Sequence, residues 1–217
     1  MKKNYLYASS FIIIFILYSA FGDREISKKS FRNNHLYEKK PSQQFPNTYL
    51  LENGDILFRR GYGVDSTVAM NFSEGEKRYS HAGIVYIEKD KIYIIHSEDE
   101  DDKRNGVFKE ELNTFIDDSP IWAVYRFNMS DKVKETIITQ ALILETQNIL
   151  FDNDFNLDED KKMYCSEFIY KVVNRSANEE IIHAGKRFMS RTFVTISNLY
   201  ENKYSKLVQS SHKKIKE

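Results

Sequence analysis

The sequence predicts an α+β domain in which an antiparallel sheet packs against helices. Runs rich in β-formers are concentrated between residues 54 and 127, whereas the helical patterns follow from residue 130 onward. Strands and helices in separate runs are typical of α+β domains rather than of alternating α/β units. The only cysteine, Cys165, falls at the start of one of the helical patterns, which predicts a thiol at the N-terminus of a core helix.

The composition is that of one globular domain. The 217 residues include 32 Lys plus Arg and 32 Asp plus Glu, so the formal net charge is zero. With 14 Tyr, 15 Phe and only 3 Pro, the chain is rich in aromatic residues and unlike a disordered one. Because nucleic-acid binding requires a basic patch, the neutral charge argues against a nucleic-acid partner.

The N-terminus carries an export pattern. Lys2 and Lys3 precede an apolar run from Ala8 to Phe21, and Ala20-Phe21-Gly22 offers a small-x-small cleavage site. The run is short for a membrane span, which needs about 20 apolar residues. Residues 1–22 are therefore predicted to be a signal peptide, or an N-terminal membrane anchor if uncleaved. Either outcome places the protein in the periplasm, in the cell envelope or outside the cell.

The first half of the chain after this leader predicts mainly strands. Residues 23–48 are polar and aperiodic and are predicted to form a linker or arm before a domain at 49–205. The segment GDILFRR (54–60) follows a turn signal and predicts a strand, and the glycine-containing residues 61–80 predict a loop with a short helix. The runs HAGIVYIE and KIYIIHSE, separated by Lys89-Asp90, predict a hairpin.

The remaining elements are predicted from periodicity and capping residues. We expect an acidic, solvated loop at 98–106, a strand at 121–127, a helix at 130–150 capped by Ser130 or Asp131, a helix around YCSEFIYKVVN, an element of undecided type at 190–202, and a frayed basic tail at 206–217.

The lone thiol is a candidate nucleophile. An exported chain with one cysteine cannot form an internal disulfide, so the thiol is either reactive or buried as a small apolar side chain. On a helix, Cys165 shares one face with Phe168, Ile169, Val172 and Val173. A thiol in the first helical turn feels unpaired N–H groups and the positive end of the helix dipole. This position predicts a lowered pKa for the Cys165 thiol.

The hairpin brings two histidines together. With a two-residue turn at Lys89-Asp90, His81 lies opposite Glu98 and Gly83 lies opposite His96. His81 and His96 then form a diagonal pair on one face, which we expect to point toward the start of the Cys165 helix. A three-residue turn would place them on opposite faces. The other histidines lie in the arm, near a turn and in the tail: His35, His183 and His212.

A thiol nucleophile needs an imidazole base, and the imidazole needs a third group that fixes its tautomer. His81 is the candidate base, since the small Ala82 and Gly83 leave room for the cysteine helix to approach. His96 is the candidate orienting residue. Glu98, directly opposite His81, is the alternative.

Four segments carry a family resemblance. NGDILFRRG, YSHAGIVY, KIYIIHSE and YCSEFIYK, in this order, resemble the permuted papain-like amidases of the YiiX and YaeF type, relatives of the NlpC cell-wall hydrolases. The resemblance covers about residues 50–175 and implies a permuted papain-like, NlpC-like fold. It also implies Cys165 as nucleophile and His81 as base. Many members have Glu where this chain has His96, which leaves the orienting residue open between His96 and Glu98.

The expected function is therefore that of an exported cysteine hydrolase. It would cleave an amide bond, in a cell-wall peptide or an N-acyl amide, through a thioester acyl-enzyme. The set His81, His96 and Cys165 also resembles the lecithin:retinol acyltransferase-like thiol enzymes, so a lipid acyl hydrolase or acyltransferase is the alternative. A non-catalytic surface binding module is the alternative of another class. The expected partners are a peptide or lipid acyl substrate and, through the N-terminal segment alone, a membrane.

No metal and no cofactor are predicted. Acidic side chains alternate through residues 152–158 as in an EF-hand loop, but Leu157 and Met163 stand where that loop needs Gly and Glu. A solvated acidic loop before the cysteine helix is the simpler interpretation. A zinc ion held by the two paired histidines and the thiol would have suitable ligand types, but the spacing matches no compact zinc motif.

Overall fold

The computed structural model describes residues 44–61, 64–101, 104–117, 119, 121–188 and 191–212. The predicted leader and nearly all of the predicted arm lie outside these residues, as does His35. Among the helices of the described part, none is long and apolar enough to cross a membrane.

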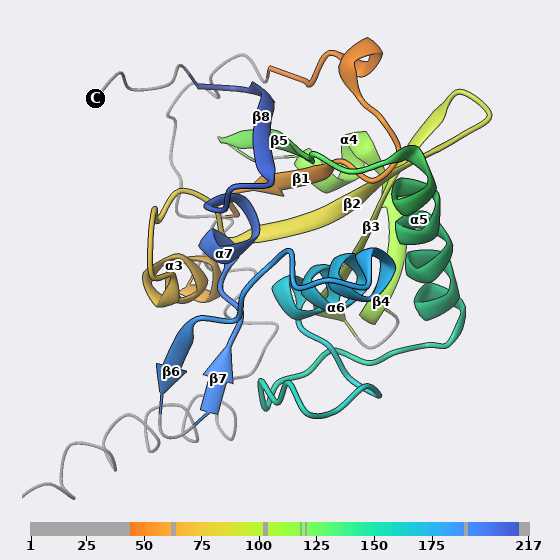
Figure 1. Ribbon diagram of the computed structural model, residues 1–217. Helices are drawn as coiled ribbons and strands as arrows, with labels where there is room; N and C mark the ends of the chain where they lie inside the picture. The colour runs from red at the N-terminus through yellow and green to blue at the C-terminus, as the bar shows by residue number, and fades with distance from the viewer. Residues whose placement is uncertain are drawn as a thin grey trace, which may run out of the picture. The chain divides into compact units, whose positions relative to one another are not determined.

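A six-stranded sheet forms the centre of the fold (Figure 1). Its order is β4-β3-β2-β1-β5-β8, and every neighbouring pair is antiparallel. The strands are β1 (Ile56–Arg59), β2 (His81–Glu88), β3 (Lys91–Asp101), β4 (Arg104–Glu111), β5 (Trp122–Phe127) and β8 (Ser205–Ser210). A separate two-stranded sheet pairs β6 (Lys186–Phe188) with β7 (Arg191–Phe193). The predicted antiparallel α+β class is confirmed.

The helices follow the sequence patterns with a few changes. They are the 3-10 helix η1 (Thr48–Leu50) and the α-helices α3 (Val64–Phe72), α4 (Leu112–Ile116), α5 (Asp131–Thr146), α6 (Cys165–Ala177) and α7 (Ile196–Tyr200). Ser130 caps α5, as predicted, by accepting the Val133 N–H. The segment 190–202, whose type the sequence left open, forms β7 and α7.

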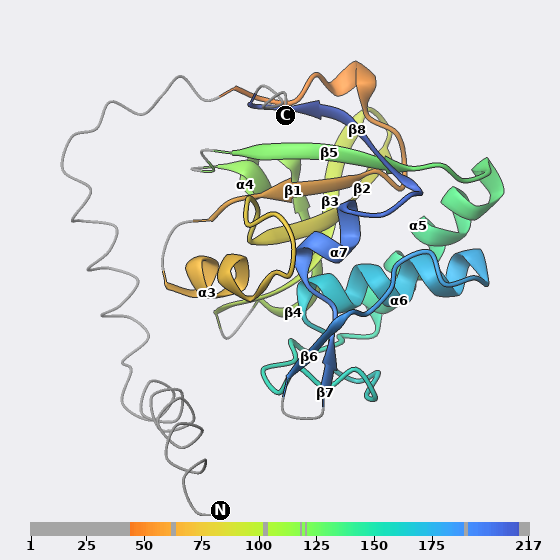
Figure 2. The same cartoon turned by 60° about the vertical axis from the view of Figure 1, so that its left-hand side comes forward.

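The two faces of the sheet bury different helices (Figure 2). Ile56, Phe58, Ala82 and Ile84 share one core cluster with buried residues of α5 and α6. The alternate strand residues point to the opposite face, where they share a second core cluster with the three buried side chains of α4. The sheet residues of this second cluster are Leu57, Val85, Ile94, Trp122 and Val124. Because side chains alternate along a strand, this division assigns each residue of β2 and β3 to a face.

The β2–β3 hairpin has the predicted register. Lys89 and Asp90 both have positive φ, 49° and 66°, as a two-residue type I′ turn requires. Glu88 pairs with Lys91. At the other end, a Cβ added to Gly83 would overlap Ile94 Cγ2 and lie 3.0 Å from His96 Cβ, so only glycine fits there.

Two predicted segments were wrong. Residues 98–106 are not a solvated loop, because β3 runs to Asp101 and pairs with β4, which begins at Arg104. Strand β4 lies at the sheet edge, where charged side chains can reach water, and Asn105 donates to the Asp99 carboxylate. Residues 206–210 are likewise not a frayed tail but belong to β8, which pairs with β5 at the opposite edge.

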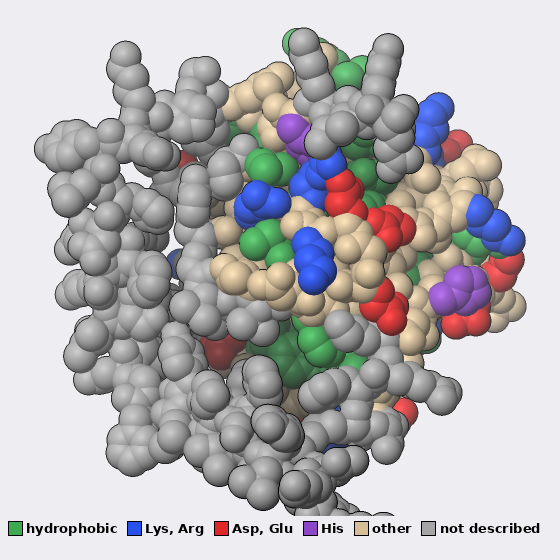
Figure 3. Space-filling view, turned by 90° about the vertical axis from the view of Figure 1, so that its left-hand side faces the viewer, with side chains coloured by type: hydrophobic (Ala, Val, Ile, Leu, Met, Phe, Trp, Pro, Cys, Tyr) green, Lys and Arg blue, Asp and Glu red, His purple; other side chains and the backbone are tan. Residues whose placement is uncertain are grey.

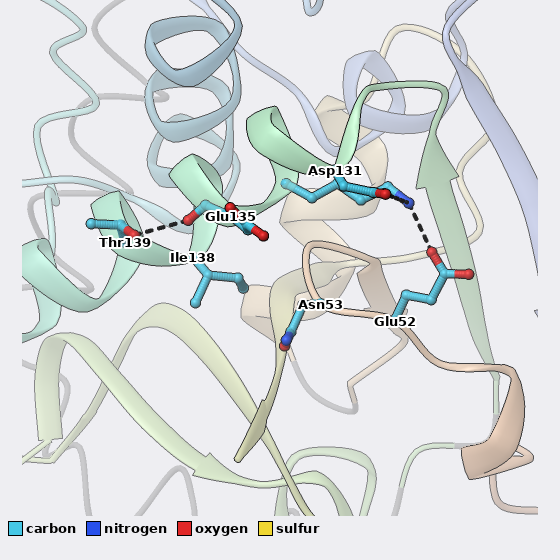
Figure 4. Close-up of a pocket in the computed structure, with 7 residues that line it drawn as sticks. Glu52, Asn53, Asp131, Glu135, Ile138 and Thr139 are labelled. Atoms are coloured by element: carbon cyan, nitrogen blue, oxygen red, sulfur yellow. Dashed lines mark hydrogen bonds and ion pairs between the residues drawn. The ribbon is translucent and has the colours of Figure 1, made fainter.

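A buried ion pair ties β1 to β5. The Asp55 side chain is 1% exposed, and its carboxylate accepts hydrogen bonds from Arg126 Nε at 2.7 Å and Nη2 at 2.9 Å. Glu52 contacts Arg126 at the surface and accepts from Lys134 at 2.8 Å. The Glu52–Lys134 contact belongs to a surface pocket beside α5 (Figure 4).

We expect Arg126→Met to lower the free energy of unfolding by about 3 kcal/mol, because it leaves the buried Asp55 carboxylate without its counter-ion. Lys134→Met is the matched control. It removes a more exposed pair and should cost less than about 1 kcal/mol. Urea unfolding followed by circular dichroism measures both, and equal losses in the two variants would contradict the assignment.

Candidate functional site

The two strand histidines are in direct contact. His81 begins β2 and His96 lies in β3, and their side chains are 9% and 0% exposed. His81 Nε2 is 2.9 Å from His96 Nδ1, and the two ring planes meet at 82°. The predicted same-face pair is therefore confirmed.

The pair faces α4 rather than α6. Ala82 packs in the core cluster that contains α6, so its neighbour His81 points to the other face. Phe115 of α4 contacts both rings, with centroid distances of 5.5 Å to His81 and 5.0 Å to His96. We expected the imidazoles to point toward the start of the cysteine helix, but they lie on the α4 face, because alternation assigns the α6 face to Ala82.

Cys165 reaches the sheet from the α6 face. It is the first residue of α6, and Phe168, Ile169, Val172 and Val173 form the buried stripe predicted for that helix. The half-buried thiol lies against the backbone N–H groups of Ser166 and Ala82.

The sulfur reaches the sheet at the residue that follows His81. The β2–β3 register ends at Ile84 and Ile95, so the Ala82 N–H beyond it is available to the sulfur of Cys165. Ala82 directly follows His81. The thiol therefore contacts the backbone of the residue that follows His81, while the histidine pair lies on the opposite face of the sheet.

Glu110 lies behind His96. Its Oε1 atom is 3.1 Å from His96 Nε2 but off the N–H axis, so the contact is electrostatic rather than a well-aligned hydrogen bond. The carboxylate favours a proton on Nε2, which leaves His96 Nδ1 as an acceptor. His81 must then donate from Nε2, and its Nδ1 atom carries a free lone pair. The geometry thus assigns a tautomer to each ring.

Glu98 is held by Arg59. The carboxylate accepts from Arg59 Nη2 at 3.0 Å and 2.8 Å, and its Oε2 atom is 3.6 Å from His81 Nε2. Burial alone would raise the pKa of Glu98, but His81, Arg59 and His96 outweigh it and lower that pKa to about 2. Glu98 is thus an ionised carboxylate beside the pair, while His96 is the closer partner of His81.

Burial sets the protonation of the base and of the thiol. It lowers the pKa of His81 well below the ordinary value, which leaves a neutral imidazole. Burial, together with the negative charge of Glu98, raises the pKa of Cys165 to about 12, against the opposite effect of the Ser166 and Ala82 amides. The expectation of a lowered thiol pKa was wrong, because desolvation of a thiolate outweighs the helix N-terminus. The resting site holds a neutral thiol and a neutral imidazole.

The alkylation of Cys165 by iodoacetamide should report this raised pKa. In the folded protein we expect a rate that still increases above pH 10, whereas in urea it should be half-maximal near the unperturbed value of about 8.5. Folded stability should also decline from about pH 8.5 upward, because the unfolded thiol ionises first, so circular dichroism must accompany each point. A folded-state rate that levels off below pH 8.5 would contradict the assignment.

Sequence reasoning missed three residues of the site. Arg59 ends β1 and pairs in register with His81, so the strand pattern could have found it once the sheet order was known. Glu110 was missed because the predicted loop ended at residue 106 and no element was predicted for the rest of β4. Phe115 lies on the short helix α4, which no pattern predicted. The structure also describes His183 and His212, and neither belongs to the site. His183 is exposed beside Glu180, and His212 contacts Tyr79.

Other regions of the described structure are weaker candidates for a functional site. The Asp152 carboxylate is buried and accepts the N–H groups of Asp154 and Asn156, so its oxygens organise the loop that the sequence compared with a calcium site. None of the residues around Cys165 lines the pocket of Figure 4. On the face drawn in Figure 3, acidic and basic side chains are intermingled rather than gathered by sign.

A histidine-bearing antiparallel sheet with a cysteine at the start of a packed helix defines the class of papain-like hydrolases. Within this class, the chain belongs to the family described as permuted papain-like amidase enzymes, YaeF/YiiX, C92 family, which its residues 50–209 match. The solved structures similar to it include the crystal structure of metalloprotein YiiX from Escherichia coli O157:H7, with a TM-score of 0.63 and 18% identity. That likeness covers 75% of this chain and 98% of the other. No curated protein matches the sequence.

Proposed function

We propose that this protein is an exported cysteine amidase that cleaves an amide bond through a thioester acyl-enzyme. The observation that carries the proposal is the series of contacts from Glu110 to His96 to His81, together with the contact of the Cys165 thiol with the N–H of Ala82, the residue next to His81. Membership of the permuted papain-like amidases supports an amide substrate. The apolar run at 8–21, behind two lysines, supports export.

The reaction follows from the assigned tautomers. Cys165 Sγ attacks the carbonyl carbon while its proton moves to His81 Nδ1, and the oxyanion receives the Cys165 N–H, which α6 leaves unpaired at its first position. The C–N bond then breaks, the amine takes the proton from His81, and a thioester remains. Water attacks the thioester, His81 accepts a proton from it, and the thiolate leaves and is reprotonated. His96 keeps His81 in the productive tautomer throughout.

A lipid acyl substrate is the second candidate. The direct His81–His96 contact of 2.9 Å favours it, because a His–His–Cys set resembles the lecithin:retinol acyltransferase-like thiol enzymes. In that case an ester oxygen leaves in place of an amine, and an acceptor other than water can resolve the thioester. The thiol, the base and the orienting residue keep their roles.

Parallel incubations test the proposal. Purified protein is mixed with cell-wall muropeptides, with N-acyl amino acids and with short-chain lipid esters, beside a Cys165→Ala control. Release of an amine from either of the first two supports the amidase, and release of fatty acid from the esters supports the second candidate. Mass spectrometry of the protein should detect an acyl adduct on Cys165. If Cys165→Ala matches the unaltered protein in every assay, the thiol chemistry is refuted and a surface binding module is the better account.

A further inference from the structure

We propose that His81, His96 and Glu98 form a binding site for a divalent zinc-like cation, and that occupation of this site switches off the thiol chemistry. These are the residues that the described part of the chain groups as potential metal ligands, with one atom from each lying within 4.8 Å of the others. Cys165 is not a member of that group. The sequence predicted no metal, so the inference comes from the geometry.

The three atoms are spaced as zinc ligands. His81 Nε2 and His96 Nδ1 are 2.9 Å apart, and Glu98 Oε2 lies 3.6 Å from the first and 3.7 Å from the second. A point equidistant from all three is about 2.0 Å from each, which is the length of a Zn–N or Zn–O bond in proteins. A cation there replaces the hydrogen bond between the two rings with three coordination bonds.

The surroundings resemble the outer shell of a metal site. His96 is fully buried between Phe108 and Phe115, and its outer nitrogen faces the Glu110 carboxylate, as ligating histidines usually do. Two imidazoles and one carboxylate suit zinc and exclude Mg²⁺ and Ca²⁺, which prefer oxygen ligands. Arg59 opposes the cation because it holds Glu98 with its own positive charge. We therefore expect reversible rather than permanent occupation.

Occupation has a consequence for the base, which rests on the function proposed above. A metal on His81 Nε2 takes the position of the proton that His96 accepts in the metal-free site. The neutral ring must then carry its proton on Nδ1, the atom that has to receive the proton of Cys165. Zinc thus imposes the one tautomer that cannot act as base, and hydrolysis should stop while the fold and the thiol remain intact.

Isothermal titration of the purified full chain with zinc chloride tests the site without any substrate. We expect one zinc per chain, unchanged in Cys165→Ala and in the surface control His183→Ala. His96→Leu and Glu98→Gln should each weaken binding by tenfold or more. Histidine ¹⁵N spectra should show the His81 proton moving from Nε2 to Nδ1 on zinc addition. Loss of binding in Cys165→Ala, or unaltered binding in His96→Leu, would overturn the site.

Hydrolysis assays test the consequence separately. Zinc should abolish turnover of whichever substrate is found, and EDTA should restore it. Turnover that persists at saturating zinc, or that requires zinc, overturns the inhibitory effect while leaving the titration result in place. If no substrate is turned over in the presence of EDTA, the proposed hydrolase fails, but the calorimetric and spectral results still decide the metal site.

Discussion

Cys165→Ala is expected to reduce the hydrolysis rate by at least about 1,000-fold, because the acyl-enzyme cannot form without the sulfur. His81→Ala should cost a similar factor, since the neutral thiol of the resting site needs a base to release its proton. The double variant should be hardly worse than either single one, because nucleophile and base act as a unit. Rates are compared at saturating substrate.

The surface variant His183→Ala is the matched control for His81→Ala and should retain full activity. Each variant also needs a urea unfolding curve, because His81 is buried and Cys165 is half-buried. If the rate reductions of the two single variants multiply in the double variant, the two side chains act independently. The assigned thiol–imidazole pair would then be wrong.

The second large effect is expected at His96. His96→Leu should lower the rate by about 10²–10⁴-fold, the range for losing the group that fixes a catalytic imidazole. Glu98→Gln should cost less, since Glu98 Oε2 is 3.6 Å from His81 Nε2 whereas His96 Nδ1 is 2.9 Å away. This comparison decides the choice of orienting residue that the sequence left open.

A conservative variant separates orientation from structure. The side-chain oxygen of Gln at position 96 can accept the His81 N–H, so His96→Gln should recover part of the activity that His96→Leu loses. Both variants should have similar unfolding midpoints. If Glu98→Gln is the more damaging change, or if His96→Gln recovers nothing despite an intact fold, Glu98 becomes the orienting residue.

The sequence predicted those parts of the site whose positions depend on the local geometry of one chain segment. A two-residue turn at Lys89-Asp90 sets the register, and the register alone puts His81 and His96 on one face. Helical periodicity likewise placed Cys165 at the start of α6. These predictions hold because each depends on the alternation or periodicity of a single segment.

What the sequence did not predict depends on contacts between distant segments. Charged residues at 98–106 suggested a loop, and only the position of β4 at a sheet edge explains how they form strands. Glu110 was missed because no element was predicted for the second half of β4. The thiol pKa was predicted with the wrong sign, because the helix N-terminus is visible in the sequence whereas the burial of the sulfur is a property of the packed fold.

The order of the site along the chain has a consequence for biosynthesis. The catalytic base and its neighbours, His81, His96, Glu98 and Glu110, lie on three consecutive antiparallel strands. This half of the site is therefore built from contacts between near neighbours in sequence. Such contacts form early in folding. Cys165 lies later in the chain and joins this half only when α6 docks, so the folding chain passes through a stage with an assembled base and an unprotected sulfur. Pulsed alkylation during refolding should therefore label Cys165 after the β2–β3 amides are already protected from hydrogen exchange. An enzyme assembled in this order cannot act on its own chain before α6 is in place.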